Sequence, residues 1–92
     1  MIYIATTGTR FKIEPFEGSV PLKKDHDEIL NGSVYYHSPM KVKIDTTLSY
    51  NIGQEVSIGG FPTGGKGFSL RELSITNNPV LPNAKIIERR NK

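Results

Sequence analysis

The chain has 92 residues, with 12 Lys/Arg against 9 Asp/Glu, a formal net charge of +3, and no cysteine. This length fits one domain with a single core, and the lack of cysteine excludes a disulfide framework and thiolate chemistry. No basic stretch followed by a long apolar run opens the chain, and no apolar run reaches the length of a membrane span. We therefore expect a single cytoplasmic domain over residues 1–92 that does not enter a membrane.

The positive charge is concentrated in the second part of the chain. Residues 1–31 carry four Lys/Arg and five Asp/Glu, a net charge of −1, whereas residues 32–92 carry eight and four, a net charge of +4. Such an excess suits a polyanionic partner, and it equally suits a solvated basic surface. Charge alone leaves both interpretations open.

Apolar and polar residues alternate along most of the chain, which indicates half-buried β-strands. In chain order, these strand signals fall at residues 2–4, 11–13, 34–36, 40–44, 56–58 and 84–87. Residues that favour turns separate them, at 7–8, 17–19, 31–32, 38–39, 51–53 and 77–79. Six or seven short strands at this spacing predict a small barrel or sandwich.

Residues 22–31 have the features of a short helix. Pro21 suits the position at which a helix starts, and the Asn31-Gly32 pair suits the position at which one stops. The apolar residues between them would share one face over two or three turns. An ordered polar loop is the alternative, and the sequence leaves both open.

The side chains that could hold a metal or catalyse a reaction do not form a complete set. Asp25, Asp27 and Glu28 surround His26, but successive residues of a helix point in different directions and do not converge on one ion. His37 follows two tyrosines and has no acidic residue near it in sequence. We therefore expect solvated histidines, no bound metal or cofactor, and no enzymatic activity.

Residues 53–75 are the most informative segment, because they predict two strands joined by a glycine-rich loop at 59–67. The second strand carries four apolar residues of mixed parity: Phe68, Leu70, Leu73 and Ile75. A β-bulge at Arg71-Glu72 would bring all four to one face of the sheet. The competing interpretation is a helix that starts at Ser69, because Ser69-x-x-Glu72 matches a capping box. We favour the bulged strand.

The glycine-rich loop nearly matches a phosphate-binding P-loop, with Gly60, Gly65 and Lys66 at the required spacing. Gly67 replaces the Ser or Thr that would bind Mg²⁺, and the chain is too short for the βαβ scaffold of such enzymes. We therefore do not expect nucleotide hydrolysis. Glycines still let the backbone approach a phosphate closely; a hairpin tip without a ligand is the alternative.

Basic and aromatic side chains form the best candidate site. Two predicted strands each carry two cations on their polar parity, and if these strands are neighbours, four cations line one face. Such a face would follow a phosphate backbone, while exposed aromatic rings stack on unpaired bases. The alternative is that the cations keep the sheet soluble and protect its edge. The candidate nucleic-acid-binding residues are Arg10, Lys12, Tyr35, Tyr36, Lys41, Lys43, Phe61, Lys66 and Arg71.

Residues 53–75 also resemble the fourth and fifth strands of an OB-fold, most closely the anticodon-binding domain of lysyl-type class II aminoacyl-tRNA synthetases. The residues that match that family's Gly-x-x-Val-x-Val-x-Gly and Glu-Leu-Ser-Ile patterns are Gly53, Val56, Ile58, Gly60 and residues 72–75. Arg71 replaces the glycine that usually precedes the second pattern, and the loop is longer and richer in glycine. The resemblance implies a five-stranded Greek-key barrel, a fold that often binds single-stranded nucleic acid.

We thus predict an all-β fold: a small, five- to seven-stranded, OB-like barrel with at most one short helix. We expect it to bind single-stranded nucleic acid, without catalysis, through a basic sheet face and the glycine-rich hairpin. The alternative is a protein-interaction module or inhibitor that docks on a larger protein by strand addition, or that assembles with itself.

Overall fold

Eight β-strands make up the fold in the computed structural model, which describes residues 1–90. The strands are β1 (Ile2–Thr7), β2 (Lys12–Ile13), β3 (Val20–Lys24), β4 (Glu28–Ser38), β5 (Lys41–Thr46), β6 (Val56–Gly64), β7 (Gly67–Ile75) and β8 (Ala84–Arg90). Residues 1–90 contain no helix that is long and apolar enough to cross a membrane.

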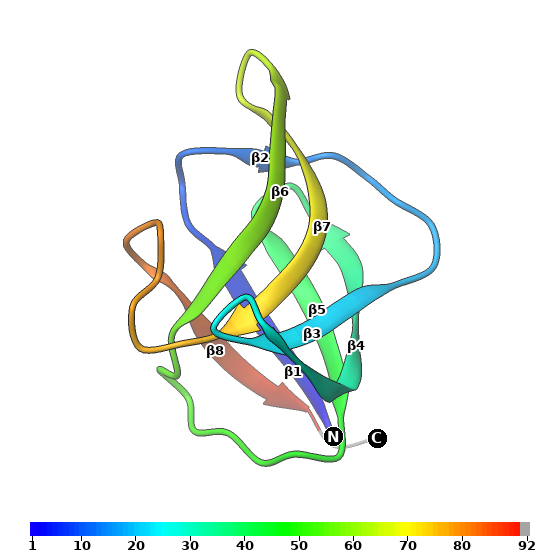
Figure 1. Cartoon of the computed structure of the whole chain (residues 1–92), viewed down its shortest axis with the longest axis vertical. Helices are drawn as coiled ribbons and strands as arrows, with labels where there is room; N and C mark the ends of the chain where they lie inside the picture. The colour runs from blue at the N-terminus through cyan, green and yellow to red at the C-terminus, as the bar shows by residue number, and fades with distance from the viewer. Residues whose placement is uncertain (91–92) are drawn as a thin grey trace.

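All eight strands belong to one mixed sheet in the order β2-β7-β3-β4-β5-β1-β8, with β6 on the other edge of β7. The sheet closes where Glu55 bridges Lys85 and where Gly53 and Gln54 exchange backbone hydrogen bonds with Ile86 of β8. Figure 1 shows the strands wrapped around a common interior, with the β6–β7 hairpin extending beyond them. The predicted small all-β barrel is confirmed, and the two-residue β2 brings the number of strands to eight.

The core forms because alternate residues of neighbouring strands point into the barrel. Val34, Ile44 and Tyr3 lie directly opposite one another across β4, β5 and β1, and all three are fully buried. Burying an aliphatic side chain of this size contributes roughly 1.5–3 kcal/mol. The alternation of apolar and polar residues therefore fixes the register of the strands, because a shift by one residue would expose the apolar side chains.

Residues 22–31, expected to form a short helix or an ordered loop, instead belong to the β3–β4 hairpin, with only residues 25–27 outside its strands. Asp25 and His26 adopt positive φ angles of 52° and 61°, and the N–H of Asp27 donates to the carbonyl of Lys24 at 3.0 Å. Two successive residues with positive φ make a type I′ turn. Such a turn matches the twist of an antiparallel pair, so it reverses the strand instead of starting a helix.

Gly32, predicted to end that helix, lies in the middle of β4. A Cβ atom added there would come within 2.9 Å of the Leu22 side chain and 3.0 Å of the Thr46 side chain. Glycine at this position therefore serves the close approach of β3 and β5 to β4. Gly32 is therefore needed for packing, although the pair Asn31-Gly32 resembles a turn signal in the sequence.

The predicted bulge in β7 is confirmed. Gly59 of β6 pairs with Glu72 and Gly60 pairs with Leu70, so Arg71 is the one extra residue on β7. The extra residue changes the parity of the strand, and all four of its apolar side chains are buried as a result. The competing helix does not form.

The glycine-rich loop expected at residues 59–67 is mostly strand. β6 continues to Gly64 and β7 begins at Gly67, which leaves only Gly65 and Lys66 at the tip. Gly64 and Gly65 have positive φ angles of 117° and 56°, a conformation that favours glycine. Residues 60–71, which we call the arm, are thus a two-stranded ribbon.

Gly60 offers a test of the bulge. Its φ is 150°, and an added Cβ would overlap the backbone oxygen of Ser69. We expect Gly60→Ala to lower the free energy of unfolding by about 3 kcal/mol, measured by urea denaturation, because the backbone must shift. Gly64→Ala is the control: its φ is also positive, but no atom lies within 4 Å of the added Cβ. It should lose only about 1 kcal/mol, and equal losses in the two variants would contradict this account.

Candidate functional site

One groove, of about 560 Å³, collects three of the predicted binding residues. Lys12 of β2, Tyr36 of β4 and Lys66 at the tip of the arm line it together. Pro39, in the turn between β4 and β5, also borders the groove. We call this feature the basic groove; it joins three segments that are far apart in the sequence.

Backbone hydrogen bonds hold β2 between the arm and the β4–β5 turn. The N–H of Lys12 donates to the carbonyl of Lys66 at 2.6 Å, and the N–H of Ile13 donates to the carbonyl of Pro39 at 2.6 Å. Ile13 is buried in the core, whereas Lys12 and Glu14 on either side of it are exposed. The cations of the basic groove are therefore placed by rigid backbone contacts to both of its sides.

Tyr36 is the aromatic member of the basic groove. It is half-buried, and its ring packs edge-on against Phe16 with the ring centroids 6.0 Å apart. Phe16 belongs to the loop between β2 and β3, so that loop fixes the orientation of the tyrosine ring. A fixed ring loses little conformational entropy when a ligand packs against it.

Glu14 also lines the basic groove, although it is not among the predicted site residues. The signal was available, because Glu14 shares the polar parity of Lys12. Its carboxylate lowers the local positive charge and adds a hydrogen-bond acceptor beside two lysines. The groove is therefore polar as well as cationic.

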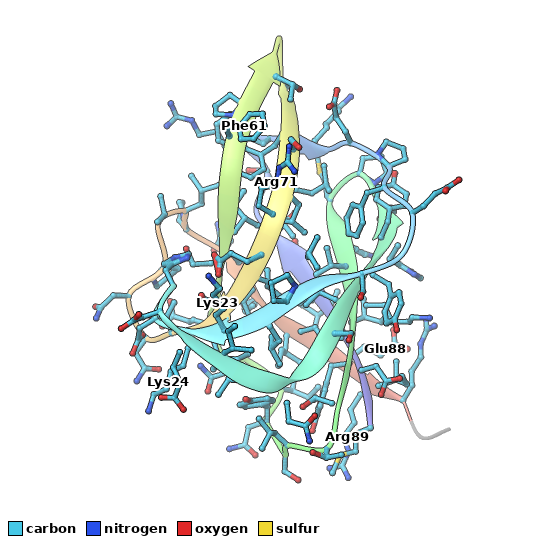
Figure 2. All side chains as sticks on the ribbon, turned by 45° about the vertical axis from the view of Figure 1, so that its right-hand side comes forward. Lys23, Lys24, Phe61, Arg71, Glu88 and Arg89 are labelled. Carbon is cyan, nitrogen blue, oxygen red and sulfur yellow. The ribbon has the colours of Figure 1, made fainter. Side chains whose placement is uncertain are left out.

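The arm carries a second pair of predicted residues. The guanidinium carbon of Arg71 lies 4.9 Å from the ring centroid of Phe61, a cation–π contact, and Figure 2 shows the two side by side on β6 and β7. Phe61 is 48% exposed. Because Arg71 is the bulged residue, its side chain leaves the alternation of β7 and lies over the ring.

A third pair lies on the outer wall formed by β4 and β5. Lys43 sits 5.0 Å from the ring centroid of Tyr35, its direct partner across the two strands. An acid lies near this wall on β8: Glu88 accepts a hydrogen bond from Arg90, which lowers the pKa of its carboxyl, and the charges of His37 and Lys41 lower it further. The charge around this wall is thus mixed.

The predicted row of four cations does not form. It required the strand of Arg10 and Lys12 to lie beside that of Lys41 and Lys43, but β2 pairs with β7 while β5 pairs with β4 and β1. Arg10 lies just before β2, with its guanidinium carbon 5.7 Å from the ring centroid of Phe11. The nine predicted residues therefore divide between the groove, the arm, the outer wall and the segment before β2.

A histidine–carboxylate pair that the sequence did not reveal links two hairpins. Nδ1 of His26 lies 2.5 Å from Oε1 of Glu72, and Oε2 of Glu72 accepts the hydroxyl of Ser74 at 2.9 Å. The backbone N–H of His26 in turn donates to Oγ of Ser74 at 2.7 Å. His26, expected to be solvated, is therefore bound to β7.

This arrangement is suited to holding the turn rather than to catalysis. In a serine triad the hydroxyl bonds to the imidazole, whereas Ser74 donates to the carboxylate and is itself fully buried. Glu72 is also enclosed, since a Cβ on Gly59 would overlap its carboxylate. We therefore assign the three side chains to the attachment of the β3–β4 turn.

Glu72→Gln tests this assignment. The amide keeps the shape of the side chain but removes the charge that strengthens both hydrogen bonds. We expect a loss of about 1–3 kcal/mol in the free energy of unfolding, measured by urea denaturation. Glu88→Gln, which removes the carboxylate of an exposed pair with Arg90, should leave the midpoint unchanged. If both variants unfold at the same midpoint, Glu72 does not attach the turn.

Within residues 1–90, no three His, Asp or Glu side chains are gathered so that they could hold a metal ion. Comparisons with known protein families, with curated proteins and with solved structures find no match. The resemblance of residues 53–75 to an OB-fold domain therefore stays a prediction, and the function has to be argued from the site.

Proposed function

We propose that this protein binds single-stranded nucleic acid and catalyses no reaction on it. The observation that carries the proposal is the basic groove, where Lys12, Lys66 and Tyr36 meet from three separate segments. A groove lined by two lysines and one packed aromatic ring matches the repeating unit of a single strand, a phosphate next to an accessible base.

The charge around the groove supports an anionic ligand. Residues 8–14 and 60–71 together contain Arg10, Lys12, Lys66 and Arg71, with Glu14 as their one carboxylate. This local excess is as large as the net charge of the whole chain. It attracts a polyanion and releases counterions from it on binding.

The arm supports an unpaired rather than a paired strand. The ring of Phe61 is exposed beside the guanidinium of Arg71, and both offer flat surfaces on which a base can stack. Such stacking contributes roughly 1–3 kcal/mol per base and requires a base that is free of its partner strand. Duplexes bury these faces within their own stack.

Salt dependence tests the proposal. A fluorescent oligothymidylate should bind at low salt, and the affinity from an anisotropy titration should weaken as salt rises, with a logarithmic slope of about −1.4 for the two phosphate contacts of Lys12 and Lys66. Counterion release predicts this slope, whereas binding without phosphate contacts predicts an affinity that does not change with salt concentration. Absence of binding at low salt, or affinity that does not change with salt, would overturn the proposal.

Charge reversal locates the surface. Lys12→Glu with Lys66→Glu should weaken oligonucleotide binding at least about tenfold, because both phosphate contacts become repulsive. The matched control is Lys23→Glu with Lys24→Glu, which changes the net charge equally but lies on β3, away from the arm (Figure 2). The control should retain most of its affinity, and an equal loss in both pairs would assign the binding to net charge alone.

A second candidate function, docking on a larger protein, rests on one edge of the arm. Within the described residues, β6 pairs only with β7 beyond the bridge at Glu55, so residues 60–64 present an open strand edge. An extended peptide could add a strand there. Pro62 lacks an N–H and interrupts this edge, which favours the nucleic-acid proposal.

A further inference from the structure

The barrel has a seam on the side of the arm away from β7. After the bridge between Glu55 and Lys85, β6 leaves β8, and the loop before β8 lies beside it (Figure 1). The N–H of Val80 in that loop donates to Oγ of Ser57, which ties the loop to β6. Above this contact the strands do not meet, and a slot of about 260 Å³ opens between them.

The side chains that line this seam slot are all apolar. Phe11 and Phe68 form one side, with ring centroids 5.1 Å apart, and Val80 and Leu81 form another. Gly59 and Gly60, together with Ile58, complete the lining. The two glycines place no side chain in the slot. A Cβ on Gly60 would overlap the backbone oxygen of Ser69 and lie 3.0 Å from the Phe68 ring, whereas a Cβ on Gly59 would meet Glu72, which does not line the slot. The close backbone approach at Gly60, opposite the bulge, therefore keeps this wall of the slot free of a side chain.

One cation lies beside the slot, and a second follows two residues later in the chain. Arg10 lies over the ring of Phe11, and it lines a neighbouring hollow that shares Val80 and Leu81 with the slot. Lys12, two residues further on, belongs to the basic groove. The segment from Arg10 to Lys12 therefore holds an aromatic ring between two positive charges, and none of the described residues that line the slot carries a carboxylate.

We propose that the seam slot takes one unstacked nucleobase of the bound single strand, with the adjoining phosphates on Arg10 and Lys12; this rests on the proposed function. An apolar slot with a cation beside it fits a ligand that is flat and apolar in one part and anionic in the next, which describes a nucleotide. All side chains of the lining are apolar, so these side chains contact the face of a base and not its hydrogen-bonding edge.

The test compares a short oligothymidylate with the matching strand from which every base is removed. Both retain the phosphates, so the ratio of their dissociation constants measures the bases alone. For the native protein we expect the intact strand to bind at least about fivefold more tightly. Phe11→Leu, which removes the ring but keeps an apolar side chain, should reduce this ratio by about fivefold if one base occupies the slot.

A second variant protects the test against a change in folding. Val80→Ser alters a side chain that is 71% exposed, and it should also reduce the ratio of the two dissociation constants. The matched control is Ile29→Ser, because Ile29 is 72% exposed and lies on the β3–β4 hairpin; it should keep the native ratio. An unchanged ratio in both slot variants, with native affinity for the intact strand, would overturn the slot and leave the proposed function standing. If neither strand binds the native protein, the proposed function fails, and the slot then suits an apolar side chain of a protein partner.

Discussion

The structure depends on one extra residue in β7. Arg71 has no counterpart on β6, and this single insertion reverses the parity of the strand halfway along its length. Without it, either the first or the second pair of apolar side chains in β7 would face solvent. With it, both pairs of apolar side chains are buried in the core. The same strand then forms part of the arm at its start and part of the barrel at its end.

The same insertion determines which partners Arg71 and Glu72 contact. Arg71 lies over the ring of Phe61, whereas Glu72 bonds to His26 and so attaches the β3–β4 turn. Both arrangements require the glycines opposite, because Gly59 leaves room for the Glu72 carboxylate and Gly60 for the backbone of the bulge. The pair of glycines in β6 is therefore a packing requirement of β7, although in the sequence it resembles part of a mobile loop.

Most of the strands and the bulge could be predicted because they follow from the parity of apolar residues, a local property of the sequence. The β3–β4 hairpin could not, since Pro21 and Gly32 resemble helix signals and the left-handed pair Asp25-His26 has no strong signature. The residue types of the site were recognised, but not their grouping. That grouping follows from the parallel pairing of Lys12 with Gly67, residues separated by most of the chain, which no local pattern encodes.

Residues 11–13, which include β2, contribute side chains to the core and to two surface sites. The backbone of this segment is hydrogen-bonded to the arm on one side and to the β4–β5 turn on the other. These bonds fix the backbone, so successive side chains point in different directions. Ile13 enters the core, Lys12 enters the basic groove and Phe11 enters the seam slot. Groove and slot consequently adjoin along consecutive residues, with the arm bordering both. A ligand that uses both must itself alternate charge and flat ring along its length, and a single strand of nucleic acid has this alternation.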